Sequence, residues 1–270
     1  MTGTAPPLAN HSARYLVSHF GLLWRVTRNE LATRYAGSIL GLLWFLLSPV
    51  LMLATYGAVY LFIFRVSTTG LTPGVYVLYI FAGLVPFLST SEALALGVPS
   101  VVTNRSVLSN TVFPIDLAPA KAVLGSQGVM VVGLAIILVG MTLSGRLAWT
   151  VLLLPLLWVL HALAILGVLW VLALVNVVFR DLPNFLNVFL MLMLVASPIA
   201  YTPAMVPRSL GVLLRLNPFS YLVMAYQSIL VLGRPPSAAH CVVLLVGSLS
   251  LFFFGSWFFA RAKRVMIDYD

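Results

Sequence analysis

The apolar positions of this chain fall into long uncharged runs that are separated by short polar segments. Five runs are long enough to cross a membrane as helices, since a helix needs roughly 20 apolar residues to cross the hydrocarbon core. They cover residues 39–64, 75–98, 119–143, 148–177 and 241–260. A sixth run, 184–203, contains Pro198 and Pro203 toward its end. The pattern predicts an all-α membrane protein with six transmembrane helices.

A different pattern precedes the first run. Between residues 14 and 36, apolar side chains recur at the helical period on one side, and polar side chains lie opposite. The apolar stripe holds Leu16, Phe20, Leu23, Trp24, Thr27 and Leu31. A helix of this kind lies on a membrane surface rather than crossing it. We therefore predict a flexible N-terminus at 1–13 and an amphipathic interface helix at 14–36, with Arg25, Arg28 and Arg34 as its basic residues.

The region 204–233 breaks the apolar pattern between the last two predicted spans. Arg208 and Arg215 interrupt it, and the Asn217-Pro218 pair disfavours helix at the residue before the proline. The apolar remainder, 219–232, is only 14 residues long, which is too short for a span. It predicts a re-entrant segment that is buried in protein or lines a wet cavity. We expect this region to form a periplasmic gate, with both arginines meeting lipid phosphate, acidic sugars or headgroups.

The basic residues indicate how the chain is oriented. Six spans put both termini on one side, and that side carries ten of the 15 lysines and arginines. The positive-inside rule assigns this side to the cytoplasm, where 261–270 forms a tail. The net charge of +9 is therefore a topology and headgroup signal rather than a sign of nucleic-acid binding. With 61% hydrophobic and 8% charged residues, the chain could not bury its apolar surface in a water-soluble core.

Few side chains inside the runs could carry out chemistry. His161 has no partner at metal-ligand spacing, and we interpret it as a packed or hydrogen-bonded residue. A phosphate loop ends in Gly-Lys-Ser/Thr, but the two lysines, Lys121 and Lys263, each follow an alanine. We expect a non-catalytic chain that binds no metal and no cofactor. If ATP drives it, the ATPase is a separate chain on the cytoplasmic face.

Several short motifs carry a family resemblance. The stretch Arg34 to Pro49, RYAGSILGLLWFLLSP, resembles the start of the permease subunit of ABC-type polysaccharide exporters, which move O-antigen, teichoic acid and capsule chains. Later motifs resemble the same family in the same order: Gly83 to Phe87, Asn104 to Leu108, Phe113-Pro114, Phe179-Arg180-Asp181, Ser197-Pro198 and Leu216-Asn217-Pro218. The chain departs from the family after Asn217-Pro218, where relatives often carry an acidic residue and an arginine but Met224 and Gln227 stand here.

The resemblance implies a homodimer in the bacterial inner membrane, to which each copy contributes one six-span transmembrane domain at 37–260. Two separate ATP-binding cassette subunits would hold ATP and Mg. The substrate would be a lipid-linked polysaccharide. The polar connection 103–116 would be the coupling segment that receives the ATPase motion. Its candidate contact residues are Asn104, Arg105, Phe113, Pro114 and Asp116.

Aromatic residues suggest where a sugar polymer could pass, because aromatic rings stack on sugar faces. Tyr56, Tyr60 and Phe64 repeat every fourth residue along one side of the first span, and we propose them as channel-lining contacts. A second candidate wall consists of Asn187, Met191 and Tyr201. Aromatic packing against a neighbouring helix, or an interfacial belt, would explain the first set equally well.

Two other functions remain open on the sequence alone. The first is an ABC permease of related fold that moves a drug or a lipid. The second is a membrane enzyme or assembly factor that acts on lipid-linked glycans without transporting them. Our preferred interpretation is the transmembrane subunit of a polysaccharide exporter, because the ordered motifs extend over about residues 15–260.

Overall fold

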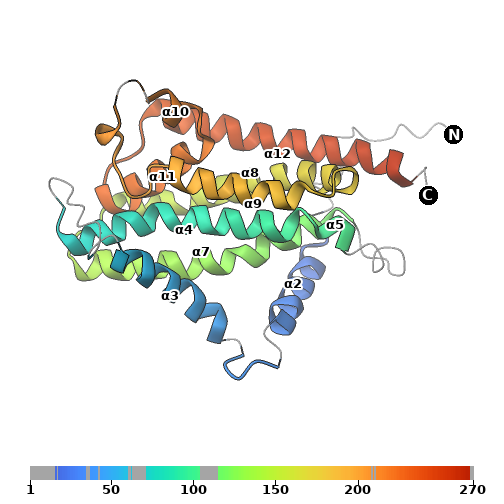
Figure 1. Cartoon of the computed structure of the whole chain (residues 1–270), viewed down its shortest axis with the longest axis horizontal. Coiled ribbons are helices and arrows are strands. Elements are labelled where there is room, and N and C mark those ends of the chain that lie inside the picture. Colours follow the sequence, from blue (N-terminus) through green and yellow to red (C-terminus); the bar gives the residue numbers. More distant parts are fainter. Residues whose placement is uncertain are drawn as a thin grey trace.

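The computed structural model describes most of the chain, and every regular element in that part is a helix (Figure 1). The described residues are 16, 18–34, 37–41, 43–59, 62, 71–103, 115–207, 209 and 211–267.

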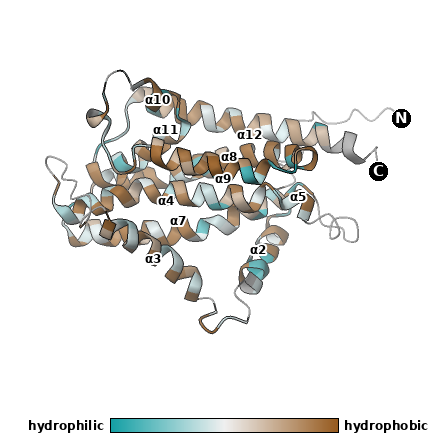
Figure 2. Cartoon of the chain, viewed as in Figure 1, coloured by the Kyte–Doolittle hydropathy of each residue, from teal (hydrophilic) through white to brown (hydrophobic). Residues whose placement is uncertain are grey.

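Four of the described helices are long and apolar enough to cross a membrane. They are α4 (Pro73–Gly97), α7 (Leu117–Leu143), α8 (Leu154–Val178) with the preceding turn η3 (Trp149–Leu153), and α12 (Ala238–Ile267). They lie side by side in Figure 1, and apolar residues run along them in Figure 2. Four of the six predicted spans are thereby confirmed as long apolar helices.

The other two predicted spans, 39–64 and 184–203, contain shorter described helices. These are α3 (Leu43–Ala58) and α9 (Leu182–Ala196). The 15 residues of α9 extend about 22 Å at 1.5 Å per residue, against a hydrocarbon core of about 30 Å. The helix ends where Ser197 turns to an extended conformation before Pro198. Helix length therefore supports four spans, and the count of six stays a prediction.

The region 204–233 holds four short helical pieces in its described part. They are η4 (Pro203–Met205), α10 (Gly211–Leu216), α11 (Pro218–Gln227) and η6 (Ser228–Leu232). The last two follow one another without a break, and Gly233 ends them in a left-handed conformation with φ 62°. This apolar piece is as short as the sequence led us to expect.

Helix α4 forms the centre of the bundle. Apolar side chains are buried all around it, and it packs against α7, α8, α9 and α11. A helix that is apolar on every side belongs in a core or in a membrane, and α4 occupies both environments. The short helix α5 (Ser100–Thr103) follows it, close to the amino-terminal helix α2 (Phe20–Arg34) in Figure 1. We call this the α5 end of the bundle, and the opposite end the α10 end.

Helices α8 and α12 cross at two glycines. A Cβ atom built on Gly167 would lie 2.2 Å from the carbonyl oxygen of Leu251, and one on Gly255 would lie 2.1 Å from the carbonyl oxygen of Gly167. The two backbones are therefore in direct contact. Small residues permit this approach, which is how helices in lipid gain van der Waals contact where the hydrophobic effect is weak.

This contact predicts the effect of a single methyl group. Gly167→Ala should lower stability by about 2 kcal/mol or more, because the added Cβ meets backbone rather than a movable side chain. Thermal unfolding of the purified protein in detergent measures the effect.

Gly125→Ala in α7 is the matched control, since a Cβ there meets nothing within 4 Å. It should be neutral or slightly stabilising, because alanine favours helix over glycine. An unchanged unfolding temperature for Gly167→Ala would contradict the close crossing.

Candidate functional site

The turn that follows α9 meets both ends of α11 in a buried polar junction. Gln227 is only 1% exposed, and its Nε2 donates to the carbonyl oxygens of Pro198 at 3.1 Å and Ile199 at 3.0 Å. The same nitrogen lies 3.4 Å from the carbonyl oxygen of Tyr79 in α4. The break after α9 leaves carbonyl groups without helical partners, and in an apolar interior each such group is costly. The Gln227 amide satisfies them from another helix.

Asn217 joins the same two elements from the other side. Its Oδ1 accepts from the amide of Phe219 at 2.9 Å, which caps α11, and its Nδ2 donates to Ser197 Oγ at 3.0 Å. Ser197 Oγ in turn donates to the carbonyl oxygen of Met193 at 2.6 Å. We call Ser197, Pro198, Ile199, Asn217 and Gln227 together the α9–α11 junction.

Helix α4 fits closely against this junction. A Cβ atom on Gly83 would lie 2.8 Å from Val223 Cγ1 and 2.9 Å from Gln227 Nε2. The rings of Phe87 and Phe219 also pack with their centroids 5.2 Å apart. Three of the sequence motifs, around residues 83–87, 197–198 and 216–218, are therefore brought together in space.

The role of Gln227 was not found from the sequence, which showed only a departure from the family at this position. The available signal was a single amide within a 14-residue apolar run, but the carbonyl groups that it satisfies lie 28 and 29 residues earlier in the chain. A buried side-chain amide is seldom without hydrogen-bond partners.

The predicted channel residues lie on two different helices. Tyr56 is half-buried and packs against the core from α3, whereas Tyr60 and Phe64 lie outside the described residues. Asn187 and Met191 share an exposed face of α9, and Met191 is 72% exposed.

Helix α4 lies between these two sets, because α3 packs on α4 and α7 while α9 packs on α4 and α8. Tyr201 is half-buried beyond the end of α9, and its hydroxyl donates to the carbonyl oxygen of Ala196 at 2.8 Å. One chain therefore does not bring all the predicted channel residues onto one wall.

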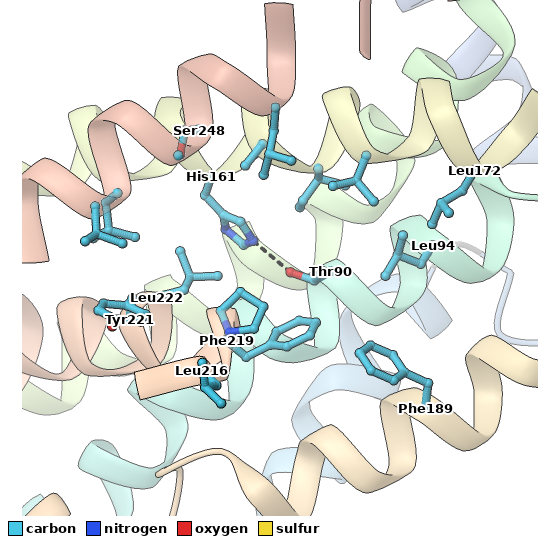
Figure 3. Close-up of a pocket in the computed structure, with 18 of the residues that line it drawn as sticks. Thr90, Leu94, His161, Leu172, Phe189, Leu216, Phe219, Tyr221, Leu222 and Ser248 are labelled. Atoms are coloured by element: carbon cyan, nitrogen blue, oxygen red, sulfur yellow. Dashed lines mark hydrogen bonds between the residues drawn. The ribbon is translucent and has the colours of Figure 1, made fainter. Parts of the chain in front are cut away.

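A cavity of about 590 Å³ opens beside the junction (Figure 3). It is bordered by α4, α8, α9, α11 and α12, and Arg215 at the end of α10 lies at its edge. Its lining is almost entirely apolar. The volume is in the range of ordinary ligand pockets.

A hydrogen-bonded histidine lies at the wall of this cavity. Thr90 Oγ1 donates to the carbonyl oxygen of Pro86 at 2.8 Å and lies 2.7 Å from His161 Nε2 (Figure 3). A hydroxyl has one proton, so the Nε2–H of His161 donates to Thr90. His161 Nδ1 is then free to accept from the Tyr226 hydroxyl, 3.4 Å away. The interpretation of His161 as a packed, hydrogen-bonded residue is confirmed.

At the α5 end, the interface helix α2 packs on α7. Leu23 and Thr27 are buried there, and Glu30 Oε2 lies 2.6 Å from Lys121 Nζ. Phe20 and Trp24 are each 55% exposed. The predicted apolar stripe is thus divided, with one edge against the bundle and the other turned outward. Lys121 is only 13% exposed on its side chain, so Glu30 neutralises a cation that the bundle partly covers.

The predicted basic and coupling residues have the following positions. Arg25 and Arg28 are exposed on α2, and Arg34 is the last residue of that helix. Asp116 is buried just before α7, and its carbonyl oxygen accepts from Trp170 Nε1 at 3.3 Å. Asn104, Arg105, Phe113, Pro114 and Arg208 lie outside the described residues.

Comparison with known proteins gives a consistent result. The model of the ABC-2 type transporter family matches residues 21–231. The O-antigen export system permease protein RfbA of Myxococcus xanthus is 29% identical over 254 residues, covering 93% of this chain and 96% of that protein. A protein of the same name from Klebsiella pneumoniae is 27% identical over 220 residues, covering 79% of this chain and 82% of its own length. The resemblance predicted from the sequence motifs is confirmed.

The junction predicts a specific loss when its amide is removed. Gln227→Met keeps the length of the side chain but leaves the carbonyl groups of Pro198 and Ile199 without this donor. Stability should fall by about 1–3 kcal/mol, as measured by thermal unfolding in detergent. Met224→Leu on the same helix is the control and should change stability little. Equal stability of Gln227→Met and wild type would rule out the amide as a necessary donor.

The contact between α2 and α7 predicts a small, salt-sensitive effect. Glu30→Gln should cost at most about 1 kcal/mol, because the Glu30 side chain is 51% exposed and the pair is screened by solvent. Amide hydrogen exchange in α2 should become faster, and the double change Glu30→Lys with Lys121→Glu should restore slow exchange. Arg25→Gln is the control, since Arg25 Nε donates to the carbonyl oxygen of Gly21 within α2 and, in the described part of the chain, the side chain has no other partner. Exchange that is unaffected by Glu30→Gln would contradict a clamping role for the pair.

Proposed function

This chain belongs to the ABC-2 type transporter family, and we propose that it is the transmembrane subunit of an ATP-driven exporter of lipid-linked polysaccharide. The chain is a multi-pass membrane protein and a permease rather than an enzyme. The observation that carries the choice of substrate is the similarity to O-antigen export permeases over 93% of the chain. ATP and Mg would be held by a separate ATP-binding subunit, because this sequence lacks a phosphate loop.

The proposed topology has six spans in the bacterial inner membrane and both termini in the cytoplasm. Helices α3 and α9 are the two short spans, and α11 with η6 is a re-entrant segment that does not cross. The positive-inside bias supports this orientation, which puts the α5 end in the cytoplasm and the α10 end in the periplasm. The carbonyl groups satisfied by Gln227 support the re-entrant assignment, since broken helices at membrane depth need protein partners.

We further propose that two copies of the chain enclose the polysaccharide path. The outward face of α9 is both exposed and apolar, whereas α4 is covered on all sides. The exposed residues of this face are Phe185, Val188, Met191, Leu192 and Val195. A second copy that packed against α3 and α9 would place the predicted channel residues of both helices, Tyr56 on α3 and Met191 on α9, along one path. Sugar rings could then slide along aromatic and thioether surfaces that bind them weakly.

The coupling segment 103–116 would receive the ATPase motion at the α5 end. Its described neighbours support the assignment, because α5, the start of α7 and α2 lie together there. Asp116 and helix α2, which packs on α7, would then move together with α7. The exposed Arg25 and Arg28 fit the headgroup region or an acidic surface of the ATPase.

Export in living cells tests this function. In a strain lacking the permease, lipid-linked polymer should accumulate inside the cell, and the wild-type chain should restore its appearance at the surface. The chain should also co-purify with the ATP-binding subunit encoded beside it. Normal surface polymer in the deleted strain, with no co-purifying ATPase, would favour the enzyme or assembly-factor alternative.

The channel assignment has its own prediction. Tyr56→Ala combined with Met191→Ala should reduce the rate of polymer export several-fold while leaving the amount of assembled complex unchanged. Pulse-labelling of surface polysaccharide measures the rate, and size-exclusion chromatography measures assembly. Val159→Ala on α8 is the control, because Val159 is exposed on a helix outside the proposed path. Full export by the double variant would refute the proposed sugar contacts.

A further inference from the structure

The cavity beside the α9–α11 junction differs in polarity along its length. The lining residues toward the α5 end, including Leu172, Leu186 and Phe189, are apolar. Leu216 and Tyr221 lie at the α10 end, together with the start of α11 (Figure 3), and Arg215, which also lines the cavity, directly precedes Leu216 in α10. No acidic residue is found among the described residues that line the cavity. The space is therefore an apolar slot with a single cation at its edge.

Of the other four polar side chains among the described residues that line the cavity, Thr90, His161 and Tyr221 are engaged with protein, and the fourth is Ser248 on α12. Thr90 and His161 bond to each other, and the Tyr221 hydroxyl donates to the carbonyl oxygen of Arg215 at 3.0 Å. The Arg215 side chain is exposed, and within the described part of the chain no carboxylate lies at ion-pair distance from it. A ligand that complements this arrangement has a long hydrocarbon chain and an anionic head.

We propose that the cavity binds one acyl chain of a bilayer phospholipid, with the lipid phosphate held by Arg215. A guanidinium group matches phosphate oxygens in charge and geometry. The bordering helix α12 carries many exposed apolar side chains, so bilayer lipid is the solvent along this side of the protein. The proposal does not depend on which substrate is exported.

A bound chain would support the junction. It would fill the space between α9 and α12 and contact Phe219 and Leu222 on α11. Dispersion contacts between the bound chain and these apolar side chains would add to their packing. The bound lipid therefore packs as part of the apolar core, and its removal lowers the unfolding temperature of the chain.

Two substitutions distinguish the head from the tail of the lipid. Gly247 lines the cavity, and a Cβ atom there meets nothing within 4 Å, so Gly247→Phe places a ring in the slot without moving the backbone. Arg215→Gln removes the cation. The matched controls are Gly74→Phe, on an equally open glycine outside the cavity, and Arg146→Gln, on an exposed arginine elsewhere.

The experiment is native mass spectrometry of the full chain purified in mild detergent, delipidated and then titrated with phosphatidylglycerol. Wild type should retain one phospholipid per chain on purification and regain it on titration, with a higher unfolding temperature. Gly247→Phe should abolish this binding, and Arg215→Gln should weaken it by about tenfold or more. Both controls should bind as wild type does.

Other outcomes overturn the proposal. Equal retention of phospholipid by Gly247→Phe and wild type would place the lipid elsewhere on the surface. A retained molecule with the mass of a polyprenyl phosphate would show that the slot takes the lipid carrier rather than a bilayer lipid. Unchanged affinity of Arg215→Gln for phosphatidylglycerol would rule out the proposed phosphate contact. Because the Arg215 side chain is exposed, this result does not depend on whether Gly247→Phe folds.

Discussion

The structure depends on one constraint, which is that every backbone polar group in apolar surroundings must find a partner within the protein. Helix α9 ends at Ala196, well short of the thickness of a hydrocarbon core, and the chain must then turn. Gln227 and Asn217 supply the hydrogen bonds that make this turn possible. Those bonds hold α11 in position, close to α4. Helix α11 in turn forms one wall of the apolar cavity.

The two ends of the bundle are connected through the same central helices. Helix α4 touches the α9–α11 junction at Gly83 and continues toward α5, while α7 receives the interface helix at Lys121 and packs along α4. A displacement at the α5 end therefore reaches the opposite end through closely packed side chains, since protein interiors deform little. This arrangement suits a permease whose energy comes from a separate subunit on one side of the membrane.

Much of the fold could be predicted from the sequence because lipid imposes a simple rule on composition and length. The runs that became α4, α7, α8 and α12 are apolar for 20 residues or more, and no other structure satisfies such a run in a membrane. Periodicity also located α2, but it could not show that Leu23 would face α7 while Trp24 faced outward. The bonds of Gln227 were beyond prediction, because no local pattern specifies which distant carbonyl groups an amide will reach.

The crossing of α8 and α12 also bears on how the protein is made. Gly167 lies in the middle of α8, and its partner backbone at Leu251 and Gly255 belongs to the last described helix. The ribosome must add 83 residues between Gly167 and Leu251. During that interval the glycine face of α8 lacks its partner helix, so this crossing forms late. Quality control that recognises an unpaired transmembrane helix would therefore act on this chain until its carboxyl-terminal helix has inserted.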